Sequence, residues 1–223
     1  MLIKFHNDIY LPSAFSVDGP EGRVYQTPHG AKYFSITTAL GEYGDQKFLE
    51  DWKKRVGEKE ATSITKNALS RGTGMHNMIE AFLKGERINK ATAGYLNFNG
   101  IRKHLTNISE IYFQEVALYS DVLELAGRTD LLGVYKNVES VVDFKTSRKQ
   151  KKESWISKYF IQGAFYAQAF KERTNGRFDI KQIVILVSND DGTSDEFISN
   201  VDDWSDELIT VVDYFKEYRR KIQ

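Results

Sequence analysis

The order of apolar and polar residues along this chain predicts short strands first, then helices, then a group of longer strands. In residues 1–44, short apolar stretches are interrupted by glycine and proline, which is typical of small strands and loops. Apolar residues then recur every three to four positions, which predicts helices. These predicted helices cover residues 45–57, 72–84 and 95–108.

The second half of the chain is predicted to contain most of the sheet. The predicted strands are residues 111–119, 125–135, 138–146, 183–187 and 196–199. Amphipathic helices are predicted over residues 153–173 and from Trp204 towards the C-terminus. The continuous apolar run 183–187 predicts a central strand that is buried on both faces. This order of elements predicts an α/β (α+β) fold in which helices flank a mixed central β-sheet.

The composition favours one domain and excludes several kinds of site. A hydrophobic content of 41% in 223 residues is enough for a substantial core, and without a repeat or a linker we expect residues 1–223 to form a single domain. The absence of cysteine excludes disulfides, thiolate zinc sites and iron–sulfur clusters held by cysteine. No signal peptide and no apolar run of membrane-spanning length is present, so we expect a soluble intracellular protein without membrane contact.

Charge is balanced overall but unevenly distributed. The net charge is zero, so no global basic field points to nucleic acid. A local basic run consists of Lys145, Arg148, Lys149, Lys151, Lys152 and Lys158. Such a run is usually solvated surface, yet it is also the kind of segment that contacts a phosphate backbone.

A predicted β-hairpin brings two carboxylates and one lysine together. If the turn is centred between Lys136 and Asn137, counting outward along both strands places Asp130 opposite Asp143. Directly opposed residues project from the same face of a sheet, with Cβ atoms about 5 Å apart. Lys145 shares that face because side chains alternate along a strand.

Two interpretations of this trio are open at the level of the hairpin alone. Close carboxylates repel each other unless a cation neutralises them, and Mg²⁺ or Mn²⁺ prefers such oxygen ligands. A divalent ion there can polarise a phosphoryl oxygen and activate water, while the lysine stabilises developing charge. The alternative is an ordinary surface hairpin with an Asp–Lys ion pair of little energetic value.

His76 and Glu115 are further candidates, each with a structural alternative. His76 borders the apolar stripe of the second predicted helix, where it is either a packing residue or a metal ligand. The nearby Gly72 and Gly74 suggest that this helix starts there, close to another backbone or to phosphate. Glu115 interrupts a predicted strand and points either into the site or out to water, and the strand pattern by itself slightly favours water.

A polar stripe on the helix predicted at residues 153–173 is another candidate. Lys158, Gln162 and Tyr166 follow one another at intervals of four residues, so they share one helix face. This face either points to solvent or offers hydrogen bonds and a stacking ring to a nucleic acid strand.

Four of these features occur in an order that resembles a known family of nucleases. Gly127 to Asp130 is a Gly-x-x-Asp, residues 143–145 are Asp-x-Lys, and Gln162 to Tyr166 is Gln-x-x-x-Tyr. Together they resemble the PD-(D/E)xK nuclease superfamily, and the Arg-Gly-x-x-x-His upstream of them is similar to its RecB-type exonuclease branch. The resemblance covers residues 34–170, and Val142 stands where the superfamily often has proline.

The resemblance implies roles for the matching residues. The implied ligands of one or two Mg²⁺ or Mn²⁺ ions are His76, Asp130, Asp143 and the backbone carbonyl of Phe144, with Lys145 as the catalytic lysine beside the two aspartates. Gln162 and Tyr166 would orient that lysine or contact DNA. The remaining predicted DNA contacts are Lys158, Arg148 and Lys149. Residues that match the site less firmly are Glu80, Glu115, Arg71 and Arg128.

The implied activity is that of a metal-dependent DNA exonuclease. We expect a restriction-endonuclease-like core over residues 111–223, with N-terminal strands and helices over residues 1–110. The expected substrate is single-stranded DNA or DNA ends, in replication, recombination, repair or phage DNA metabolism. The alternatives are an endonuclease with the same site, or an inactive DNA-binding module that accompanies a recombination or single-strand-binding protein. We expect a bacterial or phage-infected cytoplasm rather than an organelle.

Overall fold

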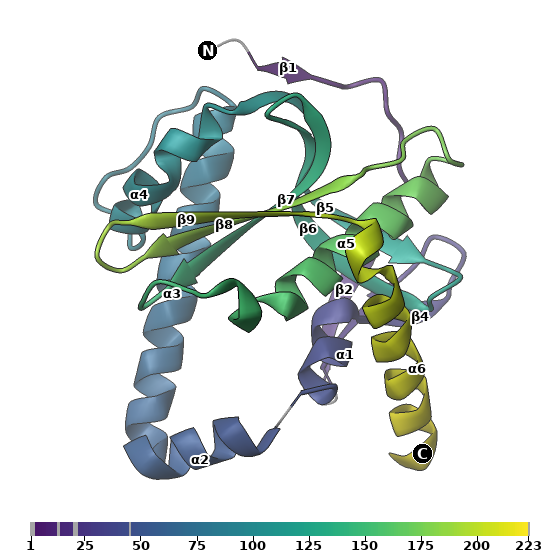
Figure 1. Ribbon diagram of the computed structural model, residues 1–223, viewed down its shortest axis with the longest axis horizontal. Coiled ribbons are helices and arrows are strands. Elements are labelled where there is room, and N and C mark those ends of the chain that lie inside the picture. Colours follow the sequence, from purple (N-terminus) through teal and green to yellow (C-terminus); the bar gives the residue numbers. More distant parts are fainter. Residues whose placement is uncertain (1–2, 13, 20–21, 45, 223) are drawn as a thin grey trace.

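A mixed β-sheet with helices on both faces is the frame of the computed structural model, which describes residues 3–12, 14–19, 22–44 and 46–222 (Figure 1). The strands are β1 (Lys4–Phe5), β2 (Phe15–Gly19), β3 (Gly22–Gln26), β4 (Lys32–Ser35), β5 (Ile108–Ser120), β6 (Leu125–Tyr135), β7 (Val138–Ser147), β8 (Gln182–Asn189) and β9 (Ser194–Asn200). The helices are α1 (Ile36–Glu42), α2 (Gln46–Val56), α3 (Glu58–Leu83), α4 (Tyr95–Leu105), α5 (Ser157–Arg173) and α6 (Ser205–Ile222), with short 3₁₀ turns η1 (Glu153–Trp155) and η2 (Asp202–Trp204). The predicted mixed sheet flanked by helices is confirmed.

The sheet forks in the middle of β6. One edge of β6 pairs with β5 along its length, while the other edge pairs with β4 at Leu125–Ala126 and with β7 at Leu131–Tyr135. The β7 strand leaves β6 after Val142 but continues beside the parallel strand β8 as far as Ser147. Residues 127–130 therefore face an opening between β4 and β7.

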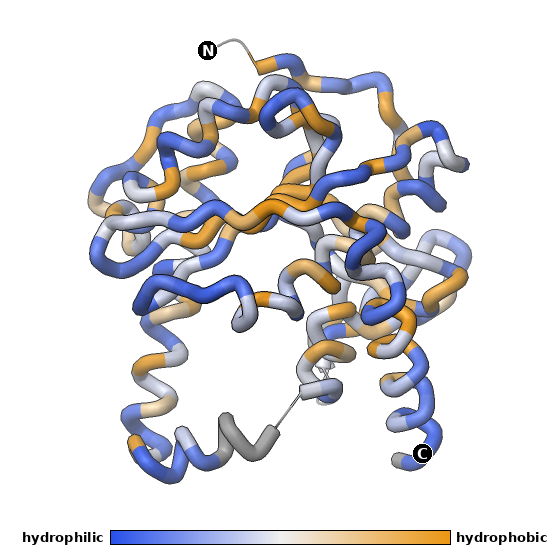
Figure 2. The backbone as a smooth tube through the Cα atoms, in the orientation of Figure 1, coloured by the Kyte–Doolittle hydropathy of each residue, from blue (hydrophilic) through white to orange (hydrophobic). Residues whose placement is uncertain are grey.

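Two apolar cores pack against the two faces of the sheet. Helices α1, α5 and α6 cover one face, and α3 and α4 cover the other (Figure 1). Val141 packs in the first core and its neighbour Val142 in the second, because successive side chains of β7 point to opposite faces. Figure 2 shows the central strands as the most apolar part of the fold. The predicted central strand at 183–187 is confirmed as the buried middle of β8.

The predicted hairpin is confirmed in its turn and its register. Tyr135 pairs with Val138, and the ladder continues to Leu131 and Val142. Both turn residues, Lys136 and Asn137, have positive φ angles of 48° and 66°. This is the backbone of the two-residue turn that matches the twist of antiparallel strands.

The predicted start of the second helix is wrong by 14 residues, since α3 begins at Glu58 instead of Gly72. The added turns are exposed for most of their length, and their apolar positions form no part of the two large cores of the described residues, which is why the prediction started the helix too late. Gly74 lies inside the helix, where a Cβ atom would meet the carbonyl oxygen of Ala93 at 1.8 Å. The glycine does permit the close approach of another backbone, as predicted, but it does not mark a helix start.

Four smaller predictions also need correction. The N-terminal region contains a helix, α1, whose N-cap Ser35 accepts a hydrogen bond from the N–H of Thr38. The third predicted helix ends at Leu105, and Ile108 already begins β5. The helix predicted at 153–173 is divided into η1 and α5, and Trp204 belongs to η2 rather than to α6.

Candidate active site

The fork of the sheet holds acidic residues from three neighbouring strands in one row. The register of β5 on β6 places Glu115 opposite Asp130, and that of β6 on β7 places Asp130 opposite Asp143, one step beyond the last paired residues. The Asp130 side chain bridges the fork, because its Oδ2 atom accepts a hydrogen bond of 2.7 Å from the N–H of Phe144. The predicted opposition of Asp130 and Asp143 agrees with this register.

Asp143 is a buried carboxylate that depends on Lys145 for its counter-charge. It is 2% exposed, and the Lys145 Nζ atom lies 2.6 Å from each of its oxygens. The hydrogen bond goes to Oδ1, and Oδ2 has no hydrogen-bond partner among the described residues. Burial raises the pKa of Asp143 to about 6, although Lys145 acts to lower it. A buried pair of this kind is not the exposed ion pair of the surface-hairpin alternative, which is therefore wrong.

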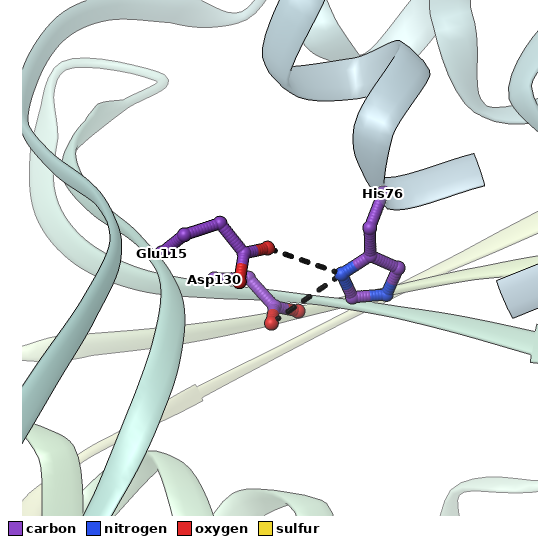
Figure 3. A group of neighbouring side chains, drawn as sticks. All are labelled: His76, Glu115 and Asp130. Carbon is purple, nitrogen blue, oxygen red and sulfur yellow. Dashed lines mark hydrogen bonds and ion pairs between the residues drawn. The ribbon is translucent and has the colours of Figure 1, made fainter. Parts of the chain in front are cut away.

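His76 of α3 meets the carboxylates of β5 and β6 across the fork. Its Nδ1 atom lies 3.4 Å from Oε1 of Glu115 and 3.5 Å from Oδ1 of Asp130. Figure 3 shows both carboxylates directed at the same ring nitrogen. The other nitrogen, Nε2, lies 2.9 Å from the carbonyl oxygen of Phe144. That carbonyl, predicted as a metal ligand, is here the partner that orients the imidazole.

The donor set around His76 fits a hard divalent cation. Among the described residues, one ligand atom each from His76, Glu115 and Asp130 lies within 4.8 Å of the others. One imidazole nitrogen with carboxylate oxygens is a set that Mg²⁺ or Mn²⁺ accepts. Asp143 is not in this group, and its Oδ2, which is ion-paired with Lys145 but accepts no hydrogen bond from a described residue, is a further candidate ligand at the next position in the row of acids.

Of the two directions left open for Glu115, the structure has the one into the site and not the slightly favoured one towards water. Glu115 contacts His76 at 3.4 Å, and its backbone has a φ angle of 48° in the middle of β5. A residue other than glycine in this left-handed region is strained, and such strain is concentrated at functional sites.

Negative charge around His76 strongly favours its protonated form. Burial lowers the pKa of His76, but the charge of Asp130 and the hydrogen bond with Glu115 outweigh burial and raise it to about 9. In the absence of metal, the imidazolium therefore neutralises part of the acidic row.

The first turns of α5 lie beneath the fork. Gln162 and Tyr166 are 7% and 2% exposed, and the Gln162 Nε2 atom donates a hydrogen bond of 2.9 Å to the Tyr166 hydroxyl. A Cβ atom on Gly127 would meet the Tyr166 ring at 2.9 Å, so the ring fills the opening beside β6. This burial contradicts the predicted stacking of a base on Tyr166. The role that fits Gln162 and Tyr166 is to pack beneath the site and hold its residues in position.

Tyr159 is a site residue that the sequence interpretation missed. The Nζ atom of Lys145 lies over its ring, 5.1 Å from the ring centre, and burial raises the pKa of Tyr159. A cation held over an aromatic face is attracted to it. The spacing of Tyr159, Gln162 and Tyr166 at i, i+3 and i+7 was a signal for this face, whereas the predicted stripe began at Lys158.

A cleft of about 1290 Å³ opens above the site, between α3 and the segment after β7. His76, Glu115 and Lys145 lie on its lining, and Arg128 and Arg148 are exposed within it. Lys151, which belongs to the predicted basic run, also lines the cleft.

Other predicted site residues have different surroundings. Lys158 donates a hydrogen bond of 2.6 Å to the carbonyl oxygen of Leu40 at the end of α1, which does not fit its predicted DNA contact. Arg71 forms an ion pair of 3.3 Å with Asp190. Glu80 lines the cleft but pairs with Lys84 one turn later on α3, at 2.6 Å. Exposed Lys149 follows β7 outside the cleft lining, and its predicted DNA contact stays a prediction.

Comparison with protein families classifies the chain. A family model described as the PD-(D/E)XK nuclease superfamily matches residues 87–222. The chain belongs to this superfamily. The resemblance inferred from the motifs is confirmed, and the mixed sheet described above is the fold expected of a PD-(D/E)XK nuclease.

Relatives of this PD-(D/E)XK nuclease include two vertebrate proteins. Mitochondrial genome maintenance exonuclease 1 of Homo sapiens is 27% identical over 158 residues, which cover 65% of this chain and 45% of that protein. The Xenopus tropicalis protein of the same name is 30% identical over 159 residues, covering 66% of this chain and 44% of its own length. The chain thus spans about half the length of the relatives it matches. A crystal structure of a candidate exonuclease from Eubacterium rectale aligns with a TM-score of 0.42 and 15% identity, over 66% of this chain and 63% of that one.

The names of these relatives bear on the expected location. They refer to mitochondria, so the similarity does not support the expectation of a bacterial or phage-infected cytoplasm. Within the described part of this PD-(D/E)XK nuclease, none of the helices combines the length and the apolar character needed to cross a membrane.

Tyr159 offers a test of how Lys145 is held in this nuclease. Tyr159→Leu is expected to lower kcat for DNA cleavage by about 3- to 30-fold, because the attraction of a cation to a ring is worth about 0.5–2 kcal/mol. Tyr159→Phe keeps the ring and is expected to retain nearly full activity. Steady-state rates on a short oligonucleotide would measure both variants, and equal losses in the two would assign the effect to the hydroxyl group instead.

Proposed function

We propose that this protein is a metal-dependent DNA exonuclease that acts on single-stranded DNA or on DNA ends. The observation that carries the proposal is the row of Glu115, Asp130 and Asp143, with His76 and Lys145 beside it, at the base of a cleft with exposed cations. The named activity of the matched relatives, an exonuclease, supports the same class of reaction.

The proposed reaction is hydrolysis of a phosphodiester bond. His76, Glu115 and Asp130 would hold Mg²⁺ or Mn²⁺, with the Oδ2 atom of Asp143 as a further ligand. Such an ion supplies Lewis-acid activation of the phosphate and of water. The Phe144 carbonyl keeps the His76 ring in place, and the ammonium of Lys145 stabilises negative charge that develops on the phosphate.

The Lys145 side chain is prepared for this role before substrate binds. Burial lowers its pKa, but the charges of Asp143 and Asp130 outweigh burial and raise it. The ammonium therefore stays charged at neutral pH, held between the Asp143 carboxylate and the Tyr159 ring. A preorganised charge of this kind costs little reorganisation during the reaction.

The site combines both predicted parts of the chain. His76 comes from the segment 1–110, and the acidic row and Lys145 come from the segment 111–223. We propose that residues 1–223 act as one catalytic domain. DNA is the proposed partner, and an accompanying recombination or single-strand-binding protein stays a prediction.

Digestion of matched linear and circular substrates tests the proposal. With Mg²⁺ or Mn²⁺, an end-labelled single strand is expected to be degraded, while a covalently closed circle of the same sequence stays intact. EDTA and Asp130→Asn should each stop the digestion, and Asp213→Asn, an exposed carboxylate on α6, serves as the matched control. Equal cutting of the circle would favour an endonuclease, and intact linear DNA with either metal would refute the nuclease proposal.

A further inference from the structure

One wall of the cleft is apolar although it faces water. It consists of Trp52 from α2 and of Ile64, Ala68 and Leu69 from α3, and we call it the apolar wall. Leu69 is 67% exposed, and none of the four belongs to the cores formed by the described residues. Figure 2 shows apolar positions recurring along the part of α3 that extends away from the sheet towards α2. Exposed apolar residues that line a concave surface point to a binding role.

A second part of the cleft lining, from β6 and the segment after β7, carries positive charge, and we call it the cationic side. Arg128, Arg148 and Lys151 line it, and none of the three has an ion-pair partner among the residues that the structure describes. The cleft lining therefore combines two chemistries, the cationic side from β6 and the segment after β7 and the apolar wall from α2 and α3, and α3 also carries His76 of the proposed metal site.

The apolar wall begins close to the site and extends away from it. Leu69 precedes His76 by seven residues, so both lie on the same face of α3, about 10 Å apart along the helix axis. Ile64 lies further from His76 on the same helix, and Trp52 continues the wall from α2. A ligand that follows the wall must therefore be elongated.

We propose that the apolar wall binds unpaired nucleobases of a DNA strand whose phosphates lie along the cationic side. The inference rests on the proposed function and names its substrate class as single-stranded DNA. A single strand carries the same two chemistries as the cleft, since it exposes both charged phosphates and apolar base faces. A duplex hides its base faces in the stack, whereas an unpaired base can lie against Trp52 or Leu69.

Binding measurements with and without bases test this inference. We would titrate protein into two fluorescent oligonucleotides of equal length in EDTA, one of thymidines and one with abasic sites throughout its middle. The wild type is expected to bind the thymidine strand at least about 10-fold more tightly, because a base–protein contact is worth about 1–3 kcal/mol. Trp52→Ala should remove about 5- to 10-fold of that preference, because it removes an aromatic ring on which a base can stack. Leu69→Ala should remove a smaller part of the preference, and both variants should leave binding of the abasic strand unchanged. Ile209→Ala, an exposed apolar residue on α6, is the matched control and should change neither affinity.

The cationic side has a distinguishable signature in the same assay. Arg148→Gln should weaken binding of both strands equally and lower the slope of log affinity against log salt by about 1. Equal binding of the two strands by the wild type, or equal loss for both strands in Leu69→Ala, would overturn the inference.

The readout does not depend on cleavage, so the two proposals fail separately. If the protein prefers the thymidine strand but cuts no DNA, base binding by the apolar wall is supported and the nuclease proposal is refuted. If the protein degrades linear DNA but binds both strands equally, the nuclease proposal is supported and base binding by the apolar wall is refuted.

Discussion

Lys145→Met is expected to lower the rate of DNA cleavage by about 100- to 1,000-fold while leaving DNA binding nearly unchanged. A fixed charge that stabilises the transition state contributes on this scale. The effect is expected in kcat, because the Lys145 ammonium is held by Asp143 and Tyr159 in the absence of substrate and is not needed to gather DNA. Single-turnover cleavage and equilibrium binding of the same oligonucleotide would separate an effect on the rate of cleavage from an effect on DNA binding.

A loss of stability must be distinguished from this loss of chemistry. Removing the lysine leaves the buried Asp143 carboxylate without its counter-charge, which costs about 3–5 kcal/mol for a buried pair. The double variant Asp143→Asn with Lys145→Met removes both charges and is expected to regain stability in urea denaturation, but not activity. If Lys145→Met cleaved DNA at the rate of the wild type, the proposed role of Lys145 in the reaction would be contradicted.

Mn²⁺ is expected to raise the melting temperature of the wild type by about 5–10 °C at a concentration of about 100 times Kd. Binding to the folded state alone contributes about 2.7 kcal/mol under that condition, and each kcal/mol shifts Tm by about 2–4 °C in a domain of this size. His76→Ala and Glu115→Gln should abolish most of the shift, since both residues belong to the group that can hold the ion. Glu207→Gln, an exposed carboxylate on α6, should keep it.

The same experiment should depend on pH in a defined direction. The pKa of His76 is raised from 6.5 to about 9 in the metal-free protein, so its stabilising effect is complete below pH 6.5 and is lost as pH rises through 9. The imidazole must lose a proton from Nδ1 to bind metal there, so the shift caused by Mn²⁺ should grow from pH 7 to pH 9. A shift that falls over this range would contradict His76 as a ligand.

The hairpin shows how far local pattern can be taken. A two-residue turn and the alternation of strand side chains were enough to place Asp130 opposite Asp143, with Lys145 on the same face. Both rules operate over a few residues, and the turn formed where Lys136 and Asn137 adopt positive φ angles.

The direction of the Glu115 side chain could not be predicted by counting residues along the strands. The place of Glu115 opposite Asp130 depends on the register of β5, which contains irregularities near Ile108 and Ile111. A one-residue change of register reverses the face of every side chain, so its direction could not be settled from the sequence. The positive φ angle at Glu115 arises only in the folded sheet. Glutamate has no preference for this backbone region, so nothing in the sequence indicated it.

The sequence by itself determined the mixed fold, the hairpin and the residue types of the site, because periodicity, turn chemistry and motif order are local properties of the chain. Only the tertiary structure decided which residues form the group that could hold a metal ion and which residues pack beneath that group. It brought Glu115 close to His76, buried Gln162 and Tyr166 beneath the fork, and placed the Tyr159 ring beside Lys145. The reason is physical: these outcomes depend on how β5 is aligned and how α5 packs, which are contacts between segments far apart in the chain.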